Sequence, residues 1–86
     1  MNSPFSLLTD TITLNRPVVI FTRNNKKLFG YLRAFDKHMN LALENVRELF
    51  SIKNKNKNRN KNITYHERYI SKLLLRGDTI ILILPI

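Results

Sequence analysis

Two short polar segments of this sequence contain the side chains best suited to hold a flat ligand. Residues 36–40 supply His38 and Asn40, and residues 76–78 supply Arg76. The imidazole and the guanidinium can stack on the two faces of a nucleobase, while the Asn40 amide offers its edge a donor and an acceptor. Stacking of this kind contributes about 1–3 kcal/mol per base. Together the three side chains predict a pocket for one unstacked base of single-stranded RNA.

Each of these residues also has an ordinary explanation when taken alone. A histidine in a turn is usually just solvated, Asp36 and Asn40 are common turn formers, and Arg-Gly-Asp at 76–78 is a common hairpin turn. The RNA hypothesis therefore depends on the joint pattern. Aromatic residues in the apolar segments are expected in the core or at an interface rather than in base stacking; these are Phe21, Phe29, Tyr31 and Phe35.

Catalytic and metal-binding signatures are missing from the sequence. It has no Cys, no Gly-rich phosphate loop and no G-x-S-x-G motif. The carboxylates of Asp36 and Asp78 belong to separate turns, and His38 and His66 stand outside any metal-ligand spacing. We therefore expect a binding protein that is not an enzyme and that has no metal, no cofactor and no small-molecule substrate.

The charge of the chain predicts a polyanionic partner. Its formal net charge is +9, from 15 Lys and Arg against 6 Asp and Glu, which favours nucleic acid first and an acidic membrane surface second. Five of the basic residues alternate with Asn near the middle of the chain: Lys53, Lys55, Lys57, Arg59 and Lys61. With almost no apolar residue, this run is expected to be a mobile loop. It would either contact phosphates without reading sequence or simply be solvated.

The length of 86 residues allows one domain, and a domain this small buries only about 60–65% of its unfolded surface. Without Cys it has no disulfide to compensate, so oligomerisation is the simplest source of additional stability. No apolar run approaches the roughly 20 residues of a membrane span, and no signal peptide is indicated. These features predict a soluble, intracellular protein.

The two polar segments are predicted to be turns between strands. Ser3-Pro4 begins a helix over about Ser3 to Thr11, with Phe5, Leu8 and Ile12 at three- and four-residue spacing. Apolar and β-branched runs after Pro17 predict five strands. The expected strands are Val18–Thr22, Lys27–Phe35, Leu41–Phe50, Tyr69–Leu75 and Thr79–Leu84.

The connections between these strands decide the expected architecture. They are mostly tight turns, and no helix is available for a parallel crossover, so the sheet should be antiparallel. Gly30, in the middle of the second strand, would permit a strong bend. The sequence therefore predicts a mainly β, strongly bent, five-stranded barrel of the SH3-like or OB-like kind, with both turns at one end. Its last strand is very apolar, which favours assembly through sheet edges.

The two turns and their flanking strands resemble the two motifs of the Sm and Sm-like protein family. Leu28-Phe29-Gly30-Tyr31-Leu32 through Asp36-x-x-x-Asn40 resembles the first motif, and Leu75-Arg76-Gly77-Asp78 resembles the second. A charged variable loop separates them, and the resemblance covers Pro17 to Leu84. It implies one Sm domain over residues 1–86, with a helix at 3–12, the first motif at 17–51, a basic variable loop at 52–66 and the second motif at 67–86.

The resemblance also implies a role for the turn residues and their partners. His38 and Arg76 would stack on a base and Asn40 would bond its edge. Gly77 would let the backbone approach the base, Asp36 and Asp78 would support the pocket, and Gly30 would permit the bend. The fourth strand of one subunit would pair with the fifth of the next in a hetero-heptameric ring of Sm subunits.

Such a ring would enclose the uridine-rich Sm site of small nuclear RNAs in pre-mRNA splicing. The protein would then act in the nucleus after assembly in the cytoplasm. Two alternatives remain open at this point. The chain could belong to an Sm-like ring that acts in messenger RNA decay or binds an oligo-uridine tail, or it could be a ring scaffold without direct RNA contact.

Overall fold

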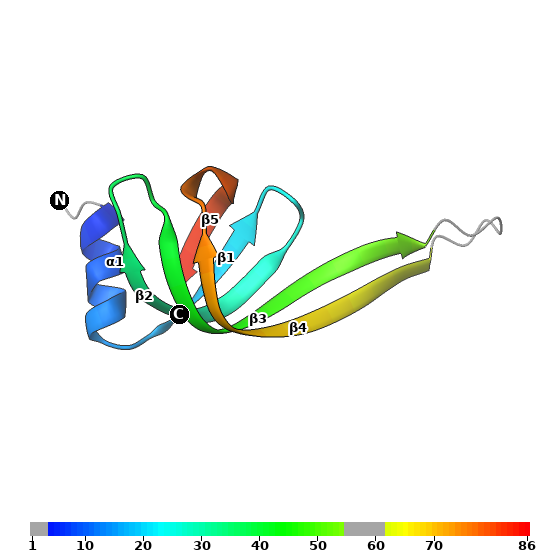
Figure 1. The fold of residues 1–86 in the computed structure, drawn as a ribbon, viewed down its shortest axis with the longest axis horizontal. Coiled ribbons are helices and arrows are strands. Elements are labelled where there is room, and N and C mark those ends of the chain that lie inside the picture. Colours follow the sequence, from blue (N-terminus) through cyan, green and yellow to red (C-terminus); the bar gives the residue numbers. More distant parts are fainter. Residues whose placement is uncertain (1–3, 55–61) are drawn as a thin grey trace.

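A short helix precedes five strands in the computed structural model, which describes residues 4–54 and 62–86 (Figure 1). The elements are α1 Pro4–Thr13, β1 Pro17–Thr22, β2 Lys27–Phe35, β3 Leu41–Asn54, β4 Asn62–Leu75, a 3₁₀ turn at Gly77–Thr79 and β5 Ile80–Pro85. No helix among these described residues is long and apolar enough to cross a membrane.

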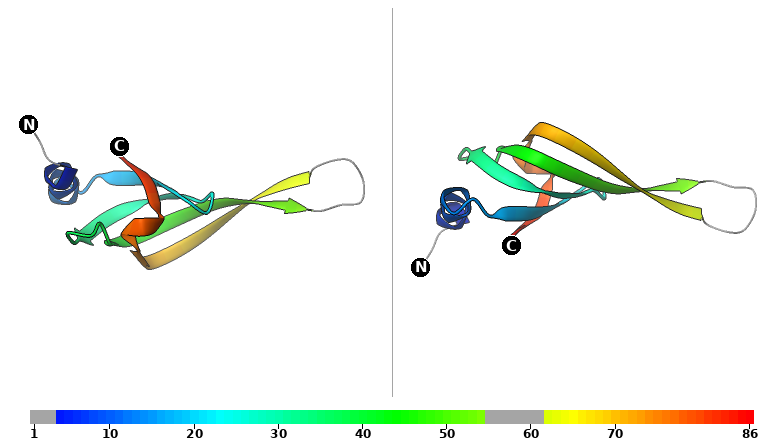
Figure 2. Two further views of the ribbon diagram at one scale, coloured as in Figure 1. Left: turned by 90° about the horizontal axis from the view of Figure 1, so that it is seen from above. Right: turned by 90° about the horizontal axis from the view of Figure 1, so that it is seen from below.

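The five strands form one antiparallel sheet in the order β4-β3-β2-β1-β5. Figure 2 shows that this sheet is strongly twisted and bent, with α1 at one end and the β3–β4 hairpin projecting from the other. The predicted fold class, a helix followed by a bent five-stranded antiparallel barrel, is confirmed. Strands β4 and β5 lie at the two edges of the sheet.

The bend has a local cause in the pairing of β2 with β3. Between two ladder pairs β2 has one residue, Gly30, where β3 has two, Asn45 and Val46. Asn45 takes up the extra length with a φ of 52°. A Cβ on Gly30 would lie 3.0 Å from Val46 Cγ2 and 3.2 Å from the Glu44 carbonyl oxygen. Gly30 thus lets the bulged strand come close, and a bulge bends and twists the sheet.

The core lies inside the curl of the sheet and is closed on one side by α1. Alternate residues of β1 and β2 are buried, as expected for strands with one face inward. Leu8 of α1 is buried with them, and Phe5 stacks on Phe35 of β2 at 5.7 Å between ring centroids. The buried apolar residues are Leu8, Val18, Ile20, Leu28, Leu32, Leu41, Leu43 and Val46.

The β3–β4 hairpin is longer than the sequence predicted. The expected strand ends at Phe50 and Tyr69 were wrong, because β3 continues to Asn54 and β4 begins at Asn62. From Val46 and Ile70 the pairing runs without interruption to Asn54 and Asn62, since each added ladder pair satisfies backbone groups even where the side chains are polar. The β-branched and aromatic residues of this extension also favour strands.

The predicted loop at residues 52–66 is therefore wrong at both ends. Lys53 lies in β3 and is exposed. The other four basic residues, and with them the prediction of a mobile loop, lie outside the described residues; they are Lys55, Lys57, Arg59 and Lys61.

The helix and the last strand differ from the prediction by one or two residues. Helix α1 continues to Thr13, and Asn15, with a φ of 52°, ends it in the left-handed conformation. Strand β5 begins at Ile80 because Thr79 closes the 3₁₀ turn, where its backbone N–H and its hydroxyl both donate to the Arg76 carbonyl oxygen.

Candidate RNA-binding site

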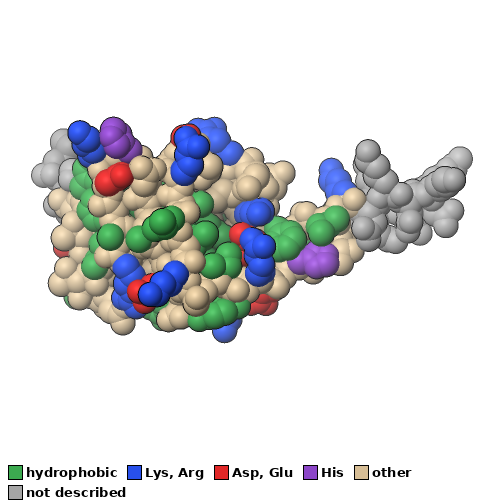
Figure 3. Space-filling view, in the orientation of Figure 1, with side chains coloured by type: hydrophobic (Ala, Val, Ile, Leu, Met, Phe, Trp, Pro, Cys, Tyr) green, Lys and Arg blue, Asp and Glu red, His purple; other side chains and the backbone are tan. Residues whose placement is uncertain are grey.

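Three turns meet at one end of the barrel. Figure 1 places the β1–β2, β2–β3 and β4–β5 connections side by side at this end, away from the tip of the hairpin. Basic side chains gather there together with a histidine and carboxylates (Figure 3). Antiparallel pairing places the β2–β3 and β4–β5 turns at one end, because alternate connections of a meandering sheet return to the same end. The bend of β2 brings the β1–β2 turn to that end as well.

Asp36 organises the turn at residues 36–40. One carboxylate oxygen, Oδ1, accepts the backbone N–H groups of His38 at 2.8 Å and Asn40 at 3.0 Å. The backbone closes the turn through a bond from Asp36 N–H to the Asn40 carbonyl oxygen at 3.2 Å, and Met39 adopts a φ of 62°. This is the local side-chain-to-backbone bonding that makes Asp a strong turn former.

The Asn40 side chain then joins this turn to the turn that follows β4. Its Nδ2 donates to Asp36 Oδ2 at 2.9 Å, and its Oδ1 accepts the backbone N–H of Gly77 at 2.9 Å. A carboxylate only accepts and a backbone N–H only donates, so the two bonds determine which way the amide faces. One hydrogen on Nδ2 and one lone pair on Oδ1 remain for a ligand.

The packing of the two turns leaves no room for a side chain at Gly77. A Cβ at this position would lie 2.1 Å from the His38 carbonyl oxygen and 2.9 Å from the carbonyl carbon of Met39. The resemblance implied that Gly77 lets the backbone approach a base. The close approach in the structure is between the two protein turns, and it brings the Gly77 N–H to Asn40.

The hydrogen bonds that the Asp36 carboxylate accepts also keep it ionised. Hydrogen bonds from the Asn40 side chain, then from the backbone of Asn40 and His38, lower the pKa of Asp36 below its ordinary value. Desolvation acts in the opposite direction and is outweighed. Asp36 is therefore ionised at neutral pH, as a carboxylate that accepts three hydrogen bonds should be.

An open pocket of about 650 Å³ lies between the two turns and the strand ends that carry them. His38 and Asn40 line it from one turn and Arg76 from the other, with the Arg76 side chain 81% exposed and paired to Asp78 at 3.0 Å. The complete lining is Ala34, Phe35, Asp36, His38, Asn40, Leu41, Ala42, Leu74, Leu75, Arg76 and Asp78.

The structure thus brings together the residues that the sequence singled out at the two turns. It does not bring Lys53 to them, because Lys53 lies on the projecting hairpin. Sequence reasoning missed Phe35 and Leu74 as pocket walls, although the position of both next to a turn could have indicated it. It also missed Arg23, whose Nε donates to the Asp78 carbonyl oxygen at 3.0 Å.

The structure combines a helix, a bulged five-stranded sheet and two turns joined by an asparagine. The chain belongs to the LSM domain family, which matches residues 11–85, and the predicted resemblance is confirmed. The chain is 48% identical to the probable small nuclear ribonucleoprotein Sm D2 of Dictyostelium discoideum, over 96% of this chain and 76% of that protein. It is 45% identical to Sm D2 of Saccharomyces cerevisiae, over 96% of this chain and 71% of that protein.

Solved structures show the same fold. A heptameric archaeal Sm protein superimposes with a TM-score of 0.69 and 26% identity, over 94% of this chain and 97% of that one. The Pyrococcus abyssi Sm protein, solved in complex with a uridine heptamer, has a TM-score of 0.71 over 99% of this chain and all of that one. At 16% identity, this second likeness concerns the fold alone.

Proposed function

We propose that this chain is a subunit of the heteroheptameric Sm ring of spliceosomal small nuclear ribonucleoproteins. In this ring it binds one base of the uridine-rich site of a small nuclear RNA, in pre-mRNA splicing. The observation that carries the proposal is the Asn40 amide, held by 2.9 Å hydrogen bonds to Asp36 and Gly77 in a pocket that His38 and Arg76 also line. The Sm D2 relatives, at 39–48% identity over most of the chain, support the choice of ring.

The orientation of the Asn40 amide suits the edge of uracil. Nδ2 keeps one hydrogen and Oδ1 keeps one lone pair, and both atoms are bonded to the same carbon, so the amide can offer a donor and an acceptor. Uracil presents a ring N–H beside a carbonyl oxygen and can form both bonds at once. His38 and Arg76 then contact the two faces of the base, while Gly77 and Asp36 keep the amide in place.

The edges of the sheet supply the ring contacts. Strand β4 has Leu74 84% exposed and Tyr69 63% exposed, and β5 exposes Leu82 and Leu84. Outer strands with apolar side chains are templates for pairing with another chain. In the proposed ring, β4 of this subunit pairs with β5 of one neighbour and β5 pairs with β4 of the other. The neighbours are other Sm subunits.

The proposed subunit binds RNA and catalyses no reaction. It needs no cofactor and no small-molecule substrate, because stacking and hydrogen bonding to a base require only the side chains described. It acts in the nucleus, where small nuclear ribonucleoproteins function, after its ring has been assembled on RNA in the cytoplasm.

An Sm-like ring is the second candidate. The probable U6 snRNA-associated Sm-like protein LSm3 of Dictyostelium discoideum is 33% identical over 86% of this chain and 77% of that protein. Identity to the four Sm D2 proteins is higher, which favours the first candidate. A tagged pull-down at moderate salt separates the two. Recovery of other Sm subunits with the major spliceosomal RNAs supports the proposal, whereas Sm-like proteins with decay factors would replace it.

The base pocket is tested by substitution in the assembled ring. The variant is His38→Ala with Asn40→Ala and Arg76→Ala, and the control is His66→Ala with Arg47→Ala. The control also removes an exposed histidine and an ion-paired arginine, since Arg47 pairs with Glu67 at 3.8 Å. We expect the first variant to lower affinity for a uridine-rich oligonucleotide about tenfold, equivalent to one stacked base. Equal affinity of the two variants would leave a ring scaffold without direct RNA contact.

A further inference from the structure

A second cavity adjoins the base pocket on the far side of the 76–79 turn. It has a volume of about 460 Å³ and is lined by Arg23, Asn24, Arg76, Asp78 and Thr79. Arg76 and Asp78 also line the base pocket, so the two cavities share a wall. A ligand that spans both would place a flat group in one cavity and a neighbouring group in the other.

Arg23 is held in this cavity by the turn itself. Its backbone N–H donates to the Thr79 carbonyl oxygen at 2.8 Å, and its Nε donates to the Asp78 carbonyl oxygen at 3.0 Å. The two Nη atoms have no partner among the described residues. A guanidinium anchored through Nε keeps its Nη donors in a known direction, which lowers the entropy lost on binding.

Asn24 and Arg76 add donors to the same cavity. The Oδ1 atom of Asn24 accepts the single hydroxyl hydrogen of Thr22, a buried residue whose hydroxyl oxygen accepts the Lys26 backbone N–H at 3.3 Å. This bond orients the amide and leaves Nδ2 as its free donor. Arg76 pairs with Asp78 through Nη2, so these two charges offset each other. The charge of Arg23 then gives the cavity a net positive charge.

We propose that Arg23, Asn24 and Arg76 bind a backbone phosphate of the RNA whose base occupies the adjoining pocket. The inference rests on the proposed RNA-binding function and adds a phosphate site to it. A phosphodiester carries one negative charge and only acceptor oxygens, which matches a cavity with donors and one uncompensated cation. Base and phosphate belong to one strand, so occupation of the first cavity brings the phosphate to the second.

The test uses the ring assembled with its partner subunits and measures affinity for a uridine-rich oligonucleotide across a range of salt concentrations. For Arg23→Gln we expect a loss of about threefold to tenfold at low salt. We also expect the slope of log affinity against log salt to fall by about 0.7, the value for one phosphate of a single strand. The matched control is Arg47→Gln on the outer face of β3, which should change neither quantity. An unchanged slope for Arg23→Gln would overturn the phosphate site.

A second measurement distinguishes phosphate contact by Arg23 from a purely structural role in positioning the turn. Oligonucleotides that each carry one neutral methylphosphonate linkage are compared on the wild-type ring and the Arg23→Gln ring. At one linkage the neutral group should weaken wild-type binding about threefold to tenfold and leave the variant unaffected. Equal losses in both rings at every linkage would mean that Arg23 only positions the turn. If Arg23→Gln prevents assembly, Asn24→Ala carries this test, because the Asn24 side chain is a proposed phosphate donor that bonds Thr22 and not the 76–79 turn. The neutral linkage should then weaken binding less in this variant than in the wild type, and equal losses would overturn the site.

The two proposals fail in different ways. If the triple pocket variant loses affinity while Arg23→Gln keeps the wild-type slope, the phosphate site is wrong and the base pocket stands. Arg76 lines both cavities, so the converse case uses His38→Ala with Asn40→Ala alone. If Arg23→Gln lowers the slope while this double variant binds like wild type, the phosphate site stands and the base pocket is wrong.

Discussion

The end of the barrel where the turns meet and the projecting β3–β4 hairpin are both polar and basic, but they constrain their side chains very differently. At the turn end, Asn40 bonds two partners and Gly77 touches the opposite backbone. On the hairpin, the Tyr65 side chain is 80% exposed and Lys53 is exposed as well. Organised donors can distinguish one base from another, whereas exposed charges on a hairpin can only attract phosphate.

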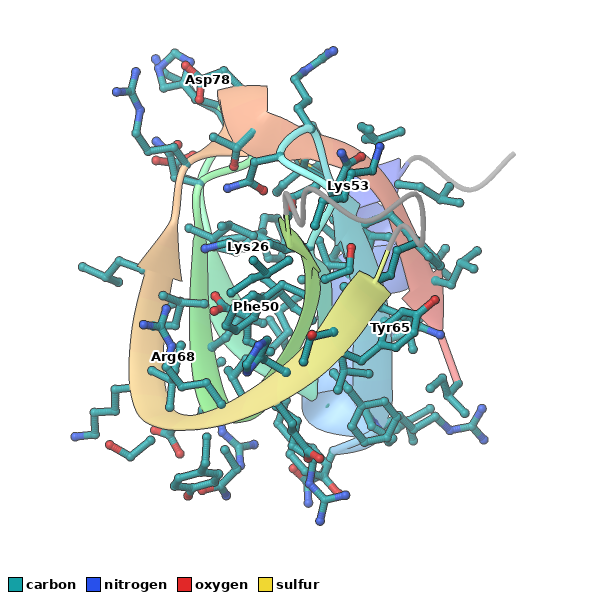
Figure 4. All side chains as sticks on the ribbon, turned by 90° about the vertical axis from the view of Figure 1, so that its right-hand side faces the viewer. Lys26, Phe50, Lys53, Tyr65, Arg68 and Asp78 are labelled. Carbon is teal, nitrogen blue, oxygen red and sulfur yellow. The ribbon has the colours of Figure 1, made fainter. Side chains whose placement is uncertain are left out.

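The base of the hairpin is nevertheless tied to the barrel. Glu48 is 5% exposed and pairs with Arg68 at 2.9 Å and with Lys26 at 3.7 Å. Lys26 also lies over the ring of Phe50, 5.6 Å from its centroid. Figure 4 shows Lys26, Phe50 and Arg68 together inside the curl of the sheet. These contacts hold the base of the hairpin against the barrel.

The largest effect is expected from Gly77→Ala, which breaks the turn end directly. The added Cβ would collide with the His38 carbonyl oxygen, so the turns must separate and the bond from Gly77 to Asn40 is lost. We expect the assembled ring to lose about 3 kcal/mol or more of stability, and RNA affinity to fall with it. Thermal unfolding of the ring measures the first and RNA titration the second. Wild-type values for both would refute the contact between the turns.

Glu48→Ala should have the next largest effect, and it acts on the base of the hairpin. Removal of a buried carboxylate leaves two cations without their partner, although Arg68 and Lys26 retain access to water. We expect a loss of about 1–3 kcal/mol in denaturant unfolding. The control is Glu67→Ala, which removes an exposed pair with Arg47 and should cost at most about 1 kcal/mol. Equal costs for the two variants would contradict the burial of Glu48.

A smaller effect should follow from acid at the turn end. The folded-state pKa of Asp36 lies below its ordinary value, so its contribution is complete above that ordinary value and is lost as pH falls through the folded-state pKa. The bond between Asn40 and Asp36 should therefore persist at pH 5 and weaken only at a pH below 3.8, the ordinary pKa of this carboxyl. The NMR signals of the Asn40 side-chain amide report this change. Asp36→Asn should remove the transition, and loss of the bond already near pH 6 would contradict its lowered pKa.

The smallest effect at physiological salt is expected from the basic run itself. The change is the replacement of Lys53, Lys55, Lys57, Arg59 and Lys61 by Gln. It should flatten the salt dependence of RNA binding while leaving the preference for uridine intact, because phosphate contacts carry no sequence information. Titrations of uridine-rich and adenosine-rich oligonucleotides at several salt concentrations provide the measurement. If the preference for uridine disappears, the contrast between the two regions is wrong.

Most of the strand pattern could be predicted from local sequence. Lys27–Phe35 was predicted with the bounds that the structure shows, because its apolar residues alternate and turn formers flank it. The length of the β3–β4 hairpin was underestimated because its outer part lacks such a pattern. Its residues have little apolar alternation, and its strands exist because Ser51 pairs with Tyr65 and Lys53 with Ile63 in a ladder that local patterns do not reveal.

The site divides in the same way between sequence and tertiary structure. The chemical groups of the site could be predicted from local sequence, because the side chains of His38, Asn40 and Arg76 suit a base whatever the fold. The bond of the Asn40 amide to Gly77 and the anchoring of Arg23 on the 76–79 turn could not, because they arise from the folding of the whole sheet. Those partners are 37 and 55 residues apart in the chain, and their contact depends on strand register and on the bulge beside Gly30. Periodicity is a local property of the chain, whereas the register between distant strands is set by the packing of the whole sheet.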